Sequence, residues 1–241
     1  MKHKKYFLIC FIASLFLCTS CTSKDQKKVV VVSDQPQTSV EEEYIPEPVD
    51  QKNAGTPTLA IKNLDKQVEL YQLGQELTEA QRQANAELKK RIIRGTFDIK
   101  ELCRLSLGKH WEVLSEAQRK RFVGLMTDLL ETKAIFSKEQ LQGQNKLYNI
   151  RYEREVFDDA EKKTATVYSK MNVPREKMTL DITYKLLITT YGWKIYDVVV
   201  DDASLLTNYK FQFDRIITEH GCDELIKRMN DKMKKISTPK T

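Results

Sequence analysis

YGWKIYDVVVDDASLLTNYKFQF, residues 191–213 of a chain of 241, joins a predicted strand to a predicted helix through a short acidic turn. A turn is expected at Asp201 and Asp202, and Ser204 stands where its side chain can cap a helix. Apolar residues alternate along the first half with the period of a half-buried strand: Trp193, Ile195 and Val199. The stretch therefore predicts a sheet that leads directly into a C-terminal helix.

Three further strands are predicted before this one. Turn signals at residues 158–159, 174–177 and 191–192 separate them, so we expect a four-stranded antiparallel meander. The third alternates most cleanly, with mostly polar residues at the opposite parity. The apolar positions of the three strands are Tyr148, Ile150 and Tyr152, then Ala165, Val167 and Met171, then Met178, Leu180, Ile182, Tyr184, Leu186 and Ile188.

Helical patterns lie on both sides of the sheet region. Residues 59–94 fit two helices or one bent helix, and residues 205–217 and 225–233 form two more. Asp98 resembles a helix cap, with Gly108 expected at the end of that helix. Ser115 with Gln118 forms a capping box before a wide apolar face that carries Phe122, Leu125, Met126, Leu129 and Leu130. We predict an α+β fold, a curved four-stranded antiparallel sheet covered by N- and C-terminal helices that enclose an apolar lipid pocket.

The N-terminus carries the pattern of an export signal. Lys2, Lys4 and Lys5 precede an apolar run too short to span a membrane, so residues 1–20 are predicted to be a signal peptide. Cys21 follows two small residues and is the predicted lipidation site. Cys18 occupies a position where lipoprotein signals usually have Leu, so plain signal cleavage stays open as the alternative.

Composition divides the rest of the chain. Residues 21–58 are polar, Pro-containing and without period, which predicts a disordered tether; residues 59–236 form the predicted domain, and residues 237–241 a frayed tail. Loss of the signal removes three lysines and no acid, which lowers the formal charge from +6 to +3. That charge is too weak to indicate a nucleic-acid partner. Cys103 and Cys222 can be free or bridged, and no obligate interface is visible, so we expect a monomer.

The sequence contains little that indicates catalysis. Neither His110 nor His220 stands at a metal-ligand spacing from other ligand residues, so no metal site is predicted. Glycine-rich nucleotide motifs and hydrolase motifs are missing from the sequence, and no cofactor is expected. The best catalytic candidate is Asp197, whose strand parity matches Trp193 and Ile195 and predicts a carboxylate that points into an apolar space.

Two segments carry a family resemblance. FDIKELCRLSLGKHW (residues 97–111), followed by SEAQRKRFVGLMTDLL and then by the 191–213 stretch, resembles the MlaC family of periplasmic phospholipid carriers, also called toluene-tolerance proteins. The likeness covers about residues 60–236. Asp201 and Asp202 depart from the Glu-Gly pair common in the family, and a lipoprotein tether is unusual for it.

The resemblance implies a non-enzymatic phospholipid carrier in the periplasm, here lipid-anchored through Cys21. It implies exchange with an inner-membrane Mla-type ABC transporter complex and an outer-membrane lipoprotein, in support of outer-membrane lipid asymmetry. A structural lipoprotein without a transportable ligand, or an isomerase-like enzyme that uses Asp197, are the alternatives. The predicted pocket residues are Phe122, Leu125, Leu129, Tyr148, Ile150, Val167, Met171, Leu180, Ile182, Tyr184, Leu186, Ile188, Trp193 and Ile195.

Overall fold

The computed structural model describes residues 54–72, 76–133, 148–174 and 177–237. The predicted signal, most of the predicted tether and the last four residues lie outside these ranges, so Cys21 does too. No helix within the described ranges has the length and the apolar character to cross a membrane.

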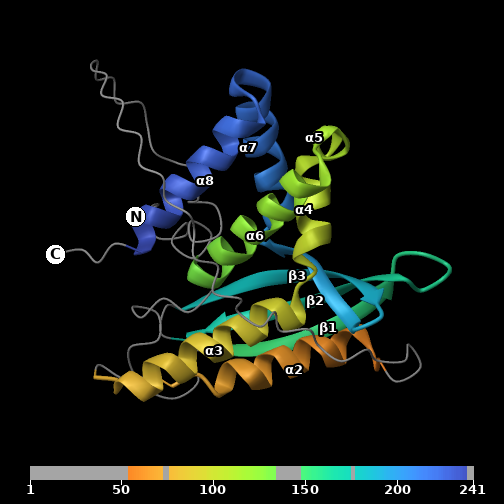
Figure 1. The fold of residues 1–241 in the computed structure, drawn as a ribbon. Helices are drawn as coiled ribbons and strands as arrows, with labels where there is room; N and C mark the ends of the chain where they lie inside the picture. The colour runs from red at the N-terminus through yellow and green to blue at the C-terminus, as the bar shows by residue number, and fades with distance from the viewer. Residues whose placement is uncertain (1–53, 73–75, 134–147, 175–176, 238–241) are drawn as a thin grey trace.

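One antiparallel sheet holds five strands in their sequence order (Figure 1). The sequence predicted four strands, and this number was wrong because the structure adds a fifth. It is a two-residue strand that folds back and pairs with Val199 and Val200. Asp201 and Asp202 make the turn between, with φ of 45° and 68°, a left-handed conformation that Asp tolerates better than most residues. The strands are β1 (Asn149–Phe157), β2 (Thr164–Val173), β3 (Met178–Thr189), β4 (Gly192–Val200) and β5 (Ala203–Ser204).

The two faces of the sheet differ in chemistry, as the alternation in β3 predicts. On one face, which we call the apolar face, Leu186 lies opposite Ala165, and Tyr184 lies opposite Val167. The other face is polar: Lys170 forms an ion pair with Asp181 at 2.8 Å. The guanidinium of Arg154 lies over the ring of Tyr168, 3.9 Å from its centroid. Only the apolar face therefore requires cover from water.

A β-bulge in β4 reverses the parity of its second half. Ile195 pairs with Leu186, but the next β3 residue, Lys185, pairs with Asp197, so Tyr196 is the extra residue. After the bulge Val198 and Val200 lie on the apolar face. The prediction that Asp197 and Val199 share a face with Ile195 was therefore wrong, because one inserted residue turns every later side chain to the other side.

Two antiparallel helices, α2 (Pro57–Glu69) and α3 (Glu79–Thr96), cover the apolar face (Figure 1). The sequence of residues 59–94 left open two helices or one bent helix, and the structure contains two. Thr78 and Gln81 form a capping box at the start of α3. The helices are joined by reciprocal hydrogen bonds at 2.8 Å between the Asn85 side chain and the backbone of Gln72.

The remaining helices pack with one another on the other side of the sheet in Figure 1. The predicted caps form: the Asp98 carboxylate accepts from the Glu101 N–H at 2.8 Å, and Ser204 accepts from the Thr207 N–H at 2.9 Å. Gly221 ends α7 with φ of 82°. The helices are α4 (Ile99–Leu107), α5 (Lys109–Val113), α6 (Glu116–Lys133), α7 (Leu205–His220) and α8 (Cys222–Ser237).

Burial divides the core into two clusters. The sheet cluster holds the apolar face with the inner sides of α2 and α3, and the helical cluster holds the inner sides of α4 to α8 together with Ile93 of α3. Phe97, between α3 and α4, packs against both clusters. In the helical cluster the Phe122 and Phe213 rings meet edge to face at 5.5 Å, and Phe213 stacks on Tyr209 at 5.3 Å.

Polar contacts fasten the junction between the clusters. The Asp98 N–H donates to the Ile195 carbonyl at 2.8 Å, and the buried Lys194 ammonium donates to the Gly95 carbonyl. Burial lowers the pKa of Lys194, although the nearby Asp98 opposes that shift. Arg94 of α3 forms an ion pair with the buried Glu131 of α6 at 2.6 Å. The segment from α3 to α4 is therefore held along the edge of β4.

Asp197 links β4 to α7. Its carboxylate accepts from the Ser204 hydroxyl at 2.8 Å and from the Leu206 N–H at 2.9 Å, and the residue is only 2% exposed. A carboxylate at the first turn of a helix satisfies N–H groups that have no partner within the helix, and it complements the helix dipole. The bulge thus directs Asp197 to the start of the C-terminal helices.

Truncation of the junction is expected to destabilise the whole domain. Phe97→Ala removes an aromatic ring that both clusters contact, and we expect it to lower the free energy of unfolding by about 3 kcal/mol. Urea denaturation followed by circular dichroism measures the change. Phe211→Ala is the matched control, because that ring is 68% exposed and its loss should cost under about 0.5 kcal/mol. Equal effects of the two changes would contradict this role of Phe97.

Removal of the Asp197 carboxylate tests its structural role. Asp197→Ala leaves the Leu206 N–H and the Ser204 hydroxyl without their acceptor, and we expect a loss of about 1–3 kcal/mol of stability. Asp231→Ala, an exposed aspartate of α8, is the control. Unchanged stability in Asp197→Ala would show that the helix start does not depend on this contact.

Candidate functional site

All eleven predicted pocket residues on the strands belong to the apolar face. Tyr148 precedes β1 at the parity of Ile150, and Ile150 pairs with Met171, which in turn pairs with Leu180. At the other end of the face, Ile188 pairs with Trp193. The members are Tyr148, Ile150, Val167, Met171, Leu180, Ile182, Tyr184, Leu186, Ile188, Trp193 and Ile195. The sequence therefore predicted one continuous apolar surface, and its role in binding stays a prediction.

Side chains from α2 and α3 cover this surface. Ile61 and Leu64 come from α2, and Leu88 and Ile92 from α3, all buried within the sheet cluster. Four polar contacts reach α2 and the residues before it. The Thr58 N–H and hydroxyl donate to Glu155 at 2.8 and 2.7 Å, the Trp193 indole donates to the Gly55 carbonyl at 3.3 Å, and the Tyr152 hydroxyl donates to Asp65.

The predicted helix wall lies elsewhere. Phe122 and Leu129 are buried in the helical cluster, and Leu125 packs against it. The structure thus places the two predicted walls in different clusters and does not bring them together around one cavity. The reason is that each apolar face has its own cover. The sheet is covered by α2 and α3, whereas α6 packs against α3, α4 and α8 and meets α7 through the Phe122–Phe213 ring pair.

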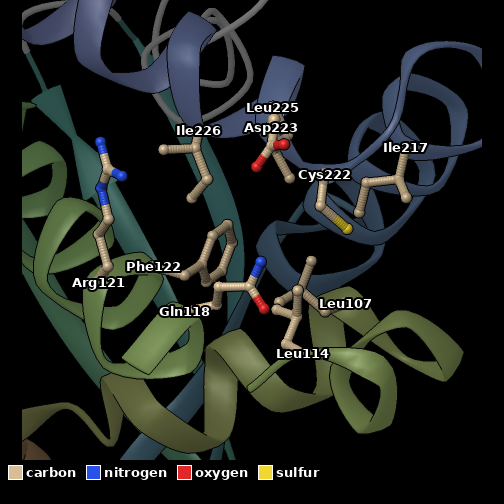
Figure 2. A pocket seen from close by; sticks show the side chains of 10 residues that line it. All are labelled: Leu107, Leu114, Gln118, Arg121, Phe122, Ile217, Cys222, Asp223, Leu225 and Ile226. Atoms are coloured by element: carbon tan, nitrogen blue, oxygen red, sulfur yellow. The ribbon is translucent and has the colours of Figure 1, made fainter. Parts of the chain in front are cut away.

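A small cavity opens in the helical cluster (Figure 2). Its volume is about 40 Å³, room for about three water molecules at 10–15 Å³ each, far below the hundreds of Å³ that a ligand pocket occupies. Phe122 is the one predicted pocket residue in its lining. The lining residues are Leu107, Leu114, Gln118, Arg121, Phe122, Ile217, Cys222, Asp223, Leu225 and Ile226.

A group of tyrosines and acids lies where the apolar face meets α2. Burial, followed by the nearby Asp65 and Glu69 carboxylates, raises the pKa of Tyr148 to about 12. Burial and Asp65 also raise the pKa values of Tyr152 and Tyr184. Asp65 was not predicted from the sequence, although its place four residues after Ile61 and three before Val68, on the apolar stripe of α2, was a signal that this carboxylate faces the sheet.

The side chains considered for chemistry have structural partners. Asp197 holds the start of α7, as described above. His110 Nε2 lies 2.8 Å from Asp214, and Lys109 lies 3.1 Å from the same carboxylate, so the LGKHW segment is fastened to α7. Those contacts, with burial opposing them, lower the pKa of Asp214. Among the described residues, no group of three or more His, Cys, Asp or Glu side chains is placed to hold a metal ion.

Cys103 and Cys222 are both free thiols, which answers the question that the sequence left open. Cys103 is buried in the helical cluster, and burial followed by the charge of Asp98 raises its pKa. Cys222 is half-buried beside the small cavity, where burial raises its pKa as well. Neither thiol has the lowered pKa of a reactive cysteine.

The tyrosine pKa values predict a loss of stability in alkali. A raised pKa means that the folded protein keeps the proton of Tyr148 when the unfolded chain loses it, so the stability present below pH 10 should fall as the pH rises from 10 towards 12. Urea denaturation at stepwise pH measures this slope. Triple replacement of Tyr148, Tyr152 and Tyr184 by Phe should flatten it, and an unchanged slope would contradict the assignment.

The comparisons with known proteins address the fold. No curated protein matches the chain. A solved structure of a phospholipid-binding protein from Ralstonia solanacearum, in complex with a phospholipid, is similar to it at a TM-score of 0.53 and 19% sequence identity. The match covers 77% of this chain and 90% of that one. At this identity the likeness shows a shared fold.

A family model supplies the identity. It is described as MlaC protein, and it matches residues 62–231, well over half of the chain. The matched range begins within α2 and ends within α8, so it includes the whole sheet and every buried residue of the two clusters except Ile61. The chain therefore belongs to the MlaC family, as the resemblance of its LGKHW and strand–turn–helix segments predicted.

Proposed function

We propose that this protein binds a phospholipid and carries it without any covalent step. The observation that carries the proposal is the apolar face of the sheet, a continuous surface of eleven predicted pocket residues, within a family fold whose Ralstonia solanacearum neighbour holds a phospholipid. Apolar surface alone is sufficient for acyl chains, because each buried methylene contributes about 0.8 kcal/mol.

The acyl chains enter between the apolar face and the helices that cover it. In the structure Ile61, Leu64, Leu88 and Ile92 fill that space, so lipid uptake requires α2 and α3 to move away from the sheet. The exchange replaces one apolar cover by another, and its net cost is small because a similar area stays out of water. The contacts at Thr58, Asp65 and Gly55 then act as the polar fastenings that must open.

Location and partners complete the proposal. The signal-like residues 1–20 support export to the periplasm, and Cys21 supports a lipid anchor in a membrane that faces it. Family membership supports exchange with an Mla-type ABC transporter complex of the inner membrane and with an outer-membrane lipoprotein, in maintenance of lipid asymmetry. An enzyme that uses Asp197 has less support, because both carboxylate oxygens are engaged at the start of α7.

Native mass spectrometry of the full chain, purified from a bacterial host without detergent and followed by solvent extraction, tests the binding. We expect phospholipid at a fixed ratio to the protein, because an apolar site of this kind does not empty into water. A clean apo mass that also resists added lipid would contradict the proposal and favour a structural role.

A matched pair of substitutions locates the site. Ile182→Trp adds bulk to the apolar face, and Leu129→Trp adds similar bulk to the helical cluster; each should cost about 1–3 kcal/mol of stability through overpacking. We expect Ile182→Trp to lower the bound phospholipid per protein and Leu129→Trp to retain it. Loss of bound phospholipid in both variants would support the pocket with two walls that the sequence predicted. Loss of phospholipid in neither variant would exclude the apolar face as the binding site.

A further inference from the structure

Four exposed apolar side chains lie at one end of the sheet, Phe157 on the apolar face and its neighbour Val156 on the polar face. We call this set the tether-end patch: Leu59, Val156, Phe157 and Tyr191, exposed by 45%, 40%, 38% and 37%. Val156 and Phe157 end β1, Tyr191 lies in the turn between β3 and β4, and Leu59 lies in the first turn of α2. Because neighbouring strands are antiparallel, the end of β1 and the turn from β3 to β4 lie at the same end of the sheet.

A chain of contacts through Trp193 and Gly55 connects two members of the patch, Phe157 and Leu59. The Phe157 ring lies 6.1 Å from that of Trp193, and the Trp193 indole donates to the Gly55 carbonyl. Gly55 in turn lies against Leu59, since a Cβ added at the glycine would come within 2.9 Å of a Leu59 methyl carbon. Figure 1 shows the start of α2 and the turn after β1 at the same end of the molecule. Singly exposed apolar residues are ordinary, but a connected group indicates a contact surface.

The composition of the patch fits the boundary of a bilayer. Tyr191 supplies a side chain that favours the level of the lipid headgroups, where an apolar ring and a polar hydroxyl are both satisfied, and Leu59, Val156 and Phe157 supply apolar side chains. The Lys162 ammonium lies 5.3 Å from the Phe157 ring centroid, which leaves a cation beside the aromatic group.

Charge does not supply the attraction. Asp158, Asp159 and Glu161 outnumber Lys162 and Lys163 by one in the adjoining turn, so the turn carries no excess of positive charge. Hydrogen bonds from the Lys163 N–H and from Thr164 lower the pKa of Asp159 to about 2, so it stays ionised. Insertion of apolar side chains, and not charge, therefore supplies the attraction to a bilayer at this end of the molecule.

The position of the N-terminal chain identifies the occupant. The described chain begins at Ala54, directly beside Gly55, and 32 residues separate it from the predicted anchor at Cys21. The anchor therefore attaches to this end of the molecule, and it raises the local concentration of bilayer at the patch, so weak apolar contacts suffice.

We propose that the tether-end patch docks onto the surface of a phospholipid bilayer and presents the end of the apolar face to it. Ile188 and Trp193 form the last pair of that face, and they lie directly behind the patch. A docked molecule thus places the gap between α2 and the sheet over the lipid that it takes up. The inference rests on the proposed phospholipid binding for its purpose, but docking can be measured without it.

Hydrogen exchange of the full chain tests the docking, with and without phosphatidylcholine vesicles. We expect slower exchange in residues 54–59, 156–163 and 189–193, and no change in residues 109–115 and 207–215 of the helical side. Because apolar contact supplies the attraction, the protection should persist in high salt and should not require anionic lipid. Protection of the helical side instead, or loss of the protection in high salt, would overturn the proposal. So would vesicles that leave the exchange unchanged, or the same protection at high protein concentration without lipid, which would indicate a second copy of the chain on the patch.

Variants assign the effect to the patch. Tyr191→Ser and Phe157→Ser should each weaken vesicle partitioning about three- to tenfold, whereas Phe211→Ser, an exposed ring of α7, should leave it unchanged. Tyr191 lies in an exposed turn, so its variant stays informative if Phe157→Ser unfolds. The phospholipid that co-purifies with Tyr191→Ser is measured in parallel. If this variant retains its phospholipid but no longer binds vesicles, docking and lipid binding are separate functions. If the protein docks but never holds phospholipid, only the proposed carrier function is refuted. Equal partitioning of Tyr191→Ser and the unmodified chain would refute the docking site.

Discussion

The β-bulge at Tyr196 is the feature on which the arrangement of this molecule depends. A regular β4 would keep one parity from Trp193 to Val200, and it would direct Asp197 into the sheet cluster and Val198 away from it. With one extra residue, Trp193, Ile195, Val198 and Val200 all serve the apolar face. Asp197 turns to the other side, where it accepts from the Leu206 N–H in the first turn of α7 and from the Ser204 hydroxyl before it. One strand thereby completes one cluster and positions the start of the other.

The two clusters answer different physical demands. The sheet has one apolar face and needs one cover, which α2 and α3 provide. The helices after them have apolar faces of their own, and they bury these faces mainly against one another. The clusters share Phe97 and the hydrogen bonds that Asp98 and Lys194 make at the edge of β4. α3 also contributes Ile93 to the helical cluster and is tied to α6 through Arg94 and Glu131, so α2 is the covering helix whose displacement, in the proposed lipid uptake, disturbs the helical cluster least.

Much of this organisation was visible in the sequence, because it depends on local chemistry. The alternation in β3, the caps at Asp98, Ser115 and Ser204, and the glycine at 221 all predicted elements that form. Features that depend on contacts between distant segments could not be predicted in this way. A bulge leaves no mark in a run such as KIYDVVV, so Asp197 was placed on the wrong face. Similarly, the apolar stripe of α6 shows that it must be buried but not by which partner, and its contacts with α7 and α8 join segments almost a hundred residues apart.

That separation has a consequence for how the chain acquires its structure. Synthesis delivers α4 and α6 before the four long strands and α7 and α8 after them, so Phe122, Met126 and Leu129 exist for some eighty residues of elongation without Tyr209, Phe213 and Leu225. During that interval the first half of the helical cluster presents an uncovered apolar stripe, the kind of surface that aggregates or recruits a chaperone. The helical cluster, although made of local elements, closes by contacts of high sequence separation, and such contacts make folding slow. Completion of this core is thus a late event that waits for the C-terminus.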